Sequence, residues 1–180
     1  ASIDHKVLLD IVFKQVTDPD VRWLINEVIS SFRSEFTIDP QEPKGLPIGN
    51  LTSQLFANVY LNELDQFMKH QLKEKHYVRY ADDFVILHPQ RDHCIDIVKS
   101  INTFLVDILK LELHPNKIHI RKFNQGVDFL GYVCFPHFVI PRDRTKHRIF
   151  KKVHDNILLY KRKQRTLESL GQSINSYMGI

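Results

Sequence analysis

Long apolar runs, paired cysteines and internal repeats are all missing from this sequence of 180 residues. No apolar stretch approaches the roughly 18 residues of a membrane-spanning helix, and no signal peptide is recognisable at the start. The two cysteines, Cys94 and Cys134, have neither metal-ligand spacing nor a disulfide pattern, which is typical of a reducing cytosol. Six glycines and eight prolines are too few for a fibrous or low-complexity chain. We therefore expect a globular, cytoplasmic protein with no membrane partner.

The composition supports a folded core, because 43% of the residues are hydrophobic and 11% are aromatic. The length predicts one domain, or one domain and part of another. The net charge of +4 is spread unevenly: residues 142–165 contain ten Lys or Arg and two Asp, whereas the remainder carries a net charge of −4. This basic segment predicts either a polyanionic partner on one side of the protein or a solvated amphipathic helix.

The spacing of apolar residues predicts the order of helices and strands. Helical spacing covers residues 1–16, 19–32, 50–72, 91–113 and the segment after Pro141. Short β-rich runs occupy residues 76–80, 84–88, 117–123 and 127–141, the last broken at residues 135–137. Trp23 and most phenylalanines are assigned to the core. Strands in antiparallel pairs with helices between them indicate an α+β fold, with helices packed on one face of a sheet.

Two adjacent carboxylates lie in the run HYVRYADDFVILH, between two strongly apolar arms. The flanking strands place a turn near Ala81–Asp83, so Asp82 and Asp83 lie at a hairpin tip. Asp is common in turns, so an ordinary acidic turn is one interpretation. The other is a divalent-metal site, because Mg²⁺ prefers hard oxygen ligands and typically takes one or two protein carboxylates. Two such ions can stabilise an in-line phosphoryl displacement.

The run KGLPIGNLTSQLFANVYLNELD is a loop with glycine and proline that leads into the N-terminus of a helix. Gly45 and Gly49 allow the backbone to approach a ligand closely. Asn50 is a candidate helix cap, and the free amides of the first turn favour an anion. Ser53 and Gln54 are polar groups in that first turn. A tight turn with a good cap explains Gly49 and Asn50, but it does not explain the remaining pattern.

Together these segments resemble the palm of a reverse transcriptase from a bacterial retroelement. Five segments carry the resemblance, in the order in which that family has them: KGLPIGNLTSQLFAN, YADDF, LELHPNKIHI, VDFLGYVCF and SINSYMGI. The resemblance implies metal ligation by Asp82 and Asp83, and a role for Lys117 as the acid that protonates the leaving pyrophosphate. It implies these contacts with nucleotide or template: Gly49, Asn50, Ser53, Gln54 and Tyr80. It implies a primer grip formed by Phe129, Leu130, Gly131 and Tyr132.

The resemblance also implies a reaction and its participants. A deoxynucleoside triphosphate would be joined to a DNA primer on an RNA template with two Mg²⁺ ions, or Mn²⁺ in their place. Residues 1–141 would form the palm, and residues 142–180 the start of a helical thumb. The basic segment would then contact the nucleic-acid backbone through Lys146, Arg148, Lys151 and Lys152. An accessory protein is a further possible partner of the parent protein.

Two departures from the family pattern refine this interpretation. Many reverse transcriptases have proline where this chain has Gln54, and an IGNLTSQ segment resembles the enzymes of diversity-generating retroelements more than those of group II introns. In the family, a strand with a third metal-binding Asp precedes the position of Ala1, and Asp4 does not match that ligand. We therefore expect the isolated chain to be inactive and to self-associate through an exposed sheet edge.

Two other functions share part of this pattern. An RNA-templated RNA polymerase also has a palm with paired carboxylates, and the nucleotide preference would distinguish it. A polymerase-like module that binds nucleic acid without catalysis is the other alternative, and it would need no metal.

Overall fold

The computed structural model describes residues 3–31, 45–46 and 50–178. The chain divides into two compact units, Ala1–Ile120 and Arg121–Ile180. This division does not test the predicted boundary between palm and thumb after residue 141, which stays a prediction.

The described residues of the first unit form four α-helices and one β-hairpin. Its elements are α1 (His5–Phe13), α2 (Pro19–Ser30), α3 (Leu51–Gln66), a π-helical turn η1 (Phe67–Gln71), β1 (Tyr77–Tyr80), β2 (Asp83–Ile86), α4 (Arg91–Asp107) and a 3₁₀ turn η2 (Pro115–Lys117). Local capping explains two of the helix starts. Asp4 accepts a hydrogen bond from the Val7 amide, and Asp18 accepts from the amides of Asp20 and Val21.

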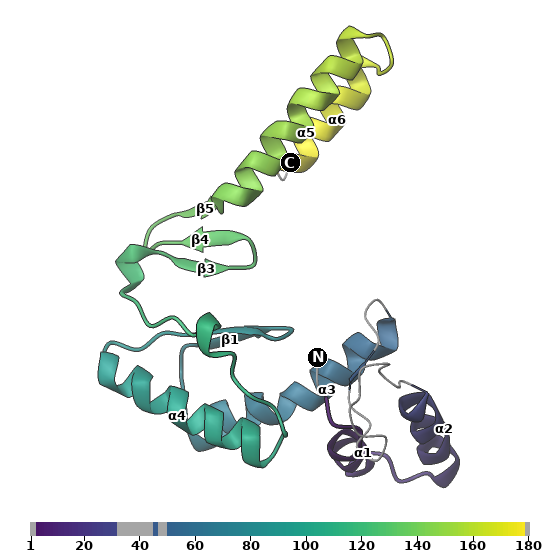
Figure 1. Ribbon diagram of the computed structural model, residues 1–180, viewed down its shortest axis with the longest axis vertical. Helices are drawn as coiled ribbons and strands as arrows, with labels where there is room; N and C mark the ends of the chain where they lie inside the picture. The colour runs from purple at the N-terminus through teal and green to yellow at the C-terminus, as the bar shows by residue number, and fades with distance from the viewer. Residues whose placement is uncertain (1–2, 32–44, 47–49, 179–180) are drawn as a thin grey trace. The chain divides into compact units, whose positions relative to one another are not determined.

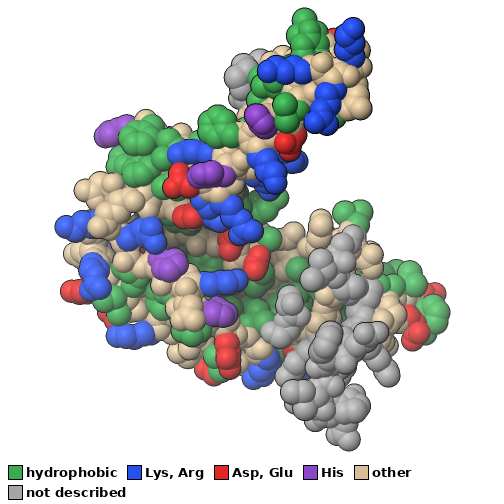
Figure 2. All heavy atoms as spheres, turned by 45° about the horizontal axis from the view of Figure 1, so that its top comes forward, with side chains coloured by type: hydrophobic (Ala, Val, Ile, Leu, Met, Phe, Trp, Pro, Cys, Tyr) green, Lys and Arg blue, Asp and Glu red, His purple; other side chains and the backbone are tan. Residues whose placement is uncertain are grey.

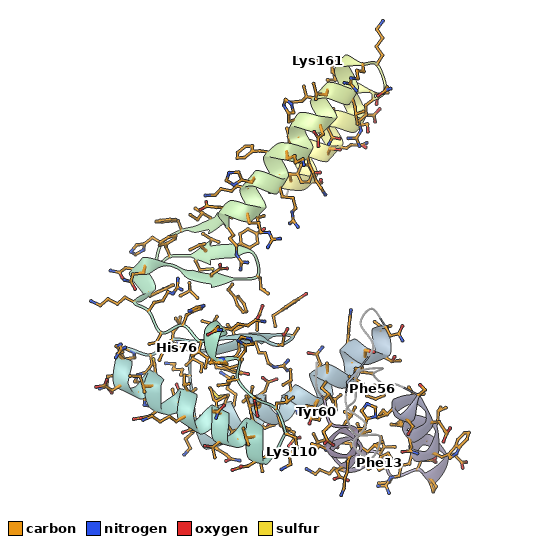
Figure 3. All side chains as sticks on the ribbon, in the orientation of Figure 1. Phe13, Phe56, Tyr60, His76, Lys110 and Lys161 are labelled. Atoms are coloured by element: carbon orange, nitrogen blue, oxygen red, sulfur yellow. The ribbon has the colours of Figure 1, made fainter. Side chains whose placement is uncertain are left out.

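The core of the first unit lies along α3, which packs against α1 and α4, while α1 also packs against α2 (Figure 1). Its fully buried side chains are Leu8, Ile29, Tyr60, Leu64, Met68, Ile101 and Leu109. Tyr60 donates a hydrogen bond of 2.5 Å to the Leu109 carbonyl, just after α4, and Figure 3 shows Tyr60 on α3 near the neighbouring Lys110. Burial raises the pKa of Tyr60 to about 12, so this phenol remains a hydrogen-bond donor. Helix α3 is therefore the central support of the unit.

The hairpin of β1 and β2 turns at the predicted position. Tyr80 pairs with Asp83, so the loop consists of Ala81 and Asp82 alone, within the predicted turn. Among the described residues this sheet has two strands only. Self-association through a free strand edge stays a prediction.

Three features of the first unit differ from the sequence-based prediction. The predicted strand over residues 117–123 is wrong: these residues contain the end of η2 and an irregular segment. A strand needs a neighbour to satisfy its amides and carbonyls, and no described strand pairs with this segment. Helix α4 ends at Asp107 instead of continuing to residue 113, and Ile108 is exposed although its spacing predicted the core. Trp23 is 65% exposed on α2, so its assignment to the core is wrong.

The second unit is a small antiparallel sheet followed by a helical hairpin (Figure 1). Its elements are a 3₁₀ turn η3 (Phe123–Gln125), β3 (Val127–Phe129), β4 (Tyr132–Cys134), β5 (Val139–Pro141), α5 (Asp143–Lys161) and α6 (Leu167–Met178). The strands pair in the order β3–β4–β5. The predicted break at residues 135–137 is confirmed, because it separates β4 from β5. Helices α5 and α6 pack side by side.

The α+β class is confirmed, with six α-helices and two small antiparallel sheets in the described part of the chain. None of the described helices combines the length and apolar character needed to cross a membrane.

Candidate functional site

The hairpin tip presents both predicted carboxylates to solvent. Asp82 occupies the loop and Asp83 opens β2, and both residues are exposed. Neither carboxylate forms an ion pair with any Lys, Arg or His side chain that the structure describes. Ala81, the other loop residue, has a φ of 51°, in the left-handed region that non-glycine residues seldom adopt. The tip is thus a tight, strained turn with two free carboxylates.

The two faces of the hairpin have different environments, as the alternation of a strand requires. Tyr77 and Phe84 point toward the core of the first unit. Tyr80, cross-strand partner of Asp83, lies on the opposite face and is 64% exposed. Val78 on that face is also exposed. Tyr80 therefore lies outside the core, on the open face that it shares with Asp83.

A polar network joins the inner face of the hairpin to α3. The Arg79 guanidinium donates to both carboxylate oxygens of Asp65, through Nε at 2.8 Å and Nη2 at 2.5 Å. Its Nη1 donates to Asn58 Oδ1 at 3.2 Å and to the carbonyl of Ala81 at 2.8 Å. The Tyr77 hydroxyl donates to Asp65 Oδ1 at 2.7 Å. This network connects the loop that bears Asp82 directly to the middle and end of α3.

The interactions within this network stabilise the charged forms of Asp65 and Arg79. Burial by itself raises the pKa of Asp65, but the hydrogen bonds from Arg79 and Tyr77 and the charge of Arg79 outweigh it, so the pKa of Asp65 is lowered. The hydrogen bond to Asp65 raises the pKa of Arg79, and burial followed by the bond to Asp65 raises the pKa of Tyr77. Asp65 is therefore ionised and Tyr77 protonated at neutral pH.

The donor set at the tip fits part of a magnesium site. Asp82 and Asp83 supply hard anionic oxygens that no described cation neutralises, and Mg²⁺ commonly takes one or two carboxylates together with water and substrate phosphates. Within the described residues, no three His, Cys, Asp or Glu side chains come together as a complete metal site. The tip can therefore contribute ligands to a metal ion, with the remaining ligands supplied from elsewhere.

The predicted nucleotide-binding residues lie around the N-terminus of α3. Asn50 is the cap residue by position and is exposed, but its side chain forms no capping hydrogen bond. Gln54 is exposed, whereas Ser53 is 6% exposed and its Oγ has no hydrogen-bond partner among the described residues. Gly49 lies outside the described residues. Contact of these residues with a nucleotide or template stays a prediction.

The start of the preceding loop is tied to α1. The Gly45 amide donates to the Ile3 carbonyl at 2.8 Å, and the Gly45 carbonyl lies 2.7 Å from Nε2 of the buried His5. A carbonyl only accepts, so Nε2 of His5 carries the proton. The loop that leads into α3 thus begins at a defined place in the core.

Lys117 closes the 3₁₀ turn η2 and is exposed. Its amide donates to the His114 carbonyl at 2.9 Å, and its side chain forms no ion pair with a described residue. Its role as a proton donor stays a prediction.

The predicted primer-grip residues form the hairpin of β3 and β4 in the second unit. Phe129 pairs with Tyr132, and the loop between them is Leu130–Gly131. Both loop residues have positive φ, 53° and 84°, as a type I′ turn requires. Leu130 and Tyr132 are exposed. The four residues therefore form one projecting turn, and their contact with a primer stays a prediction.

The predicted backbone-binding residues all lie on α5. Lys146 forms an ion pair with Asp143 at 3.2 Å, while Arg148, Lys151 and Lys152 are exposed and unpaired among the described side chains. Figure 2 shows Lys and Arg side chains gathered over the α5–α6 hairpin, next to hydrophobic ones. This surface has the charge and apolar character that a nucleic acid could contact.

Sequence reasoning missed the network of Arg79, Asp65, Asn58 and Tyr77. A signal was present. Arg79 is two residues after Tyr77 and so shares the inner face of the predicted strand, and a buried Arg requires an anionic or carbonyl partner. Nothing in the local pattern identified Asp65 as that partner, because fourteen residues separate them.

The sequence matches one family model and several known proteins. The family model described as reverse transcriptase (RNA-dependent DNA polymerase) matches residues 1–134. The group II intron-encoded protein LtrA of Lactococcus lactis is 25% identical over 193 residues, covering 73% of this chain and 32% of the relative. The putative COX1/OXI3 intron 2 protein of Saccharomyces cerevisiae is 29% identical over 138 residues, covering 68% and 16%. Protein YkfC of Escherichia coli is 23% identical over 163 residues, covering 73% and 43%.

The chain spans less than half the length of each of these curated relatives. Two of them are named as intron proteins, so the chain is distantly related to intron-encoded proteins. The preference for a diversity-generating retroelement, based on Gln54, stays a prediction.

Proposed function

This chain belongs to the reverse transcriptase family, and from that premise we propose that it forms the palm and early thumb of an enzyme that extends a DNA primer on an RNA template. The proposal includes a third carboxylate, on a strand that the resemblance places before Ala1.

The observation that supports it best is the state of the hairpin tip. Asp82 and Asp83 are exposed, without a described cationic partner, on a loop held to α3 by Arg79. An ordinary acidic turn needs no such attachment. Free carboxylates on a fixed turn are suited to binding a divalent cation with substrate phosphates.

The chain's residues have these roles in the proposed reaction. Asp82 is a direct metal ligand, and Asp83 is a weaker or indirect one because adjacent side chains diverge. Asp82 and Asp83 would help to hold Mg²⁺ ions, which would supply positive charge to neutralise the triphosphate and lower the pKa of the primer hydroxyl. Tyr80 supports the primer terminus from the face that it shares with Asp83, while Gln54 meets the nascent base pair.

Bond making and breaking balance without any other reactant than water. The primer 3′-oxygen loses its proton to water and bonds to the α-phosphorus, and the bond from that phosphorus to the bridging oxygen breaks. Pyrophosphate leaves and receives a proton from Lys117, a step that is typically worth about 10²–10⁴-fold in rate. The β3–β4 turn holds the primer, and α5 contacts the phosphate backbone through Lys and Arg.

Primer extension by the full-length protein that contains this chain tests the proposal. Asp82→Ala should abolish extension on an RNA template, and Asp83→Ala should reduce it strongly. The matched control is Asp107→Ala, which removes an exposed carboxylate at the end of α4 and should leave the rate unchanged. Extension by Asp82→Ala at the wild-type rate would contradict the metal assignment.

The choice of nucleotide tests the type of polymerase. The same assay should show incorporation of deoxynucleotides in preference to ribonucleotides. Preferential incorporation of ribonucleotides would identify an RNA-templated RNA polymerase instead.

A further inference from the structure

We infer that Arg79 is a positioning residue that holds the Ala81–Asp82 turn in the conformation needed for metal binding, an inference that rests on the proposed function. Arg79 does not touch the metal or the substrate in this inference. It acts through the backbone of the turn.

The contacts of Arg79 divide between an anchor and a target. The anchor is Asp65 of α3, which receives two hydrogen bonds, and Asn58 two turns earlier on the same face, which receives a third. The target is the Ala81 carbonyl, one residue before Asp82, at 2.8 Å from Nη1. One planar side chain therefore links a helix to the peptide group next to the proposed ligand.

The turn needs this attachment because it is strained. Ala81 has a φ of 51°, a conformation that costs an L-residue free energy and persists only where the surroundings enforce it. The pairing of Tyr80 with Asp83 fixes the two ends of the loop, but it does not hold the loop carbonyls. Arg79 holds the Ala81 carbonyl and so restricts the peptide that leads into Asp82.

The anchor is itself well fixed. The Arg79 side chain is 10% exposed, and the Tyr77 hydroxyl supplies Asp65 with a further hydrogen bond. Asp65 and Asn58 lie on α3, the helix whose first turn carries Gln54. The network therefore joins the carboxylate tip to the helix that bears the predicted nucleotide contacts, both within the first unit.

Only arginine can satisfy this set of acceptors. A guanidinium has five N–H groups in a rigid planar fork, so it can bind a carboxylate with two bonds and still donate elsewhere. Lysine keeps the charge, but its single ammonium cannot reach Asp65, Asn58 and the Ala81 carbonyl in the same geometry. Arg79→Lys therefore separates positioning from charge.

The test compares Arg79→Lys with Arg22→Lys in the full-length protein. Arg22 is a matched control, since it also donates to backbone carbonyls, those of Val16 and Phe13, but it does not contact the hairpin. Four quantities are measured: the dissociation constant for Mn²⁺ by electron paramagnetic resonance, the kcat and KM of primer extension, and the Tm. Residues that orient a metal ligand typically contribute about 10–100-fold to metal affinity or activity.

We expect Arg79→Lys to weaken Mn²⁺ binding and lower kcat by about 10–100-fold, with KM for primer–template unchanged and the enzyme still folded. Arg22→Lys should leave all but the Tm unchanged. If Arg79→Lys changes only the Tm, as Arg22→Lys does, the role is structural and the inference is wrong. If Arg79→Lys fails to fold, Asp65→Asn replaces it, and unchanged Mn²⁺ binding in that variant overturns the inference.

Asp82→Ala is assayed alongside to separate the two proposals. Full activity of Asp82→Ala rejects the proposed function itself. An inactive Asp82→Ala together with an unaffected Arg79→Lys rejects only the positioning role.

Discussion

Asp65 illustrates how one carboxylate is stabilised by its immediate partners. Its environment is partly buried, which opposes ionisation, yet Arg79 and Tyr77 donate three hydrogen bonds to it. The net result is a pKa below the ordinary value of 3.8. A group that loses its proton more readily in the folded state than in the unfolded state stabilises the fold when it is ionised.

The pH dependence of stability follows from that direction. The contribution of Asp65 is fully present above its unfolded pKa of 3.8, and it is lost as the pH falls through the lowered pKa of the folded state. Asp65→Asn should therefore be less stable than the wild type at neutral pH, and the difference should shrink in acid. Urea denaturation between about pH 2 and 6 measures this slope. An equal difference at every pH would show that ionisation of Asp65 is not responsible.

At the scale of elements, tight turns decide how the small sheet of the second unit closes. Gly126 has a φ of 81° just before β3, and a Cβ at this position would lie 2.6 Å from Val133 Cγ1 and 2.9 Å from Phe135 Cζ. The close approach of β4 thus requires a residue without a side chain. Phe135 is additionally held by ring stacking on Phe138.

Gly126→Ala should destabilise the sheet of the second unit, because a clash and a positive φ act together. Overpacking typically costs about 1–3 kcal/mol, and the left-handed conformation about 1–2 kcal/mol for an L-residue. The matched control is Gly171→Ala within α6, where a Cβ would meet no atom within 4 Å. That substitution should stabilise the helix by about 0.5–1 kcal/mol. Chemical denaturation of both variants checks the opposite signs, and a stabilised Gly126→Ala would contradict the structure.

At the scale of the whole molecule, the charge is divided along the chain. Residues 142–165 contain ten Lys or Arg and two Asp, whereas the remainder carries a net charge of −4, and α5 carries many of these basic residues. Phosphate contacts of this kind release counterions, so affinity falls as salt rises. The slope of that dependence reports how many contacts are made.

Lys151→Gln and Lys152→Gln should each weaken binding of an RNA–DNA duplex and reduce the slope of log K against log salt by about one. Lys6→Gln is the control, since Lys6 is an exposed lysine on α1 outside the basic segment, and its slope should match that of the wild type. Fluorescence anisotropy at several salt concentrations gives the slopes. Identical slopes for all three variants would show that α5 does not contact the phosphates.

Much of the local structure could be predicted because its causes lie within a few residues. Asp4 and Asp18 cap helices to which they are directly adjacent. The turn at Ala81–Asp82 follows from two β-rich arms around a short polar centre. The break after Cys134 follows in the same way from Pro136 and its neighbours.

The wrong predictions concern residues whose environment depends on distant segments. Trp23 has the large apolar side chain that is typical of a core residue, but no described element covers it. The segment at residues 117–123 has β propensity, which forms a strand only where a neighbouring strand is available. The burial of Ser53 next to the exposed Gln54 depends on how α3 is rotated against its neighbours.

The sequence by itself determined the order of elements, the carboxylate pair at a hairpin tip and the family to which the chain belongs, because motifs and periodicity are local in the chain. Only the tertiary structure decided what holds that tip. Arg79 meets Asp65 across fourteen residues and Asn58 across twenty-one. Side chains so far apart are brought together by the packing of the hairpin on α3, and no spacing rule along the chain encodes that contact.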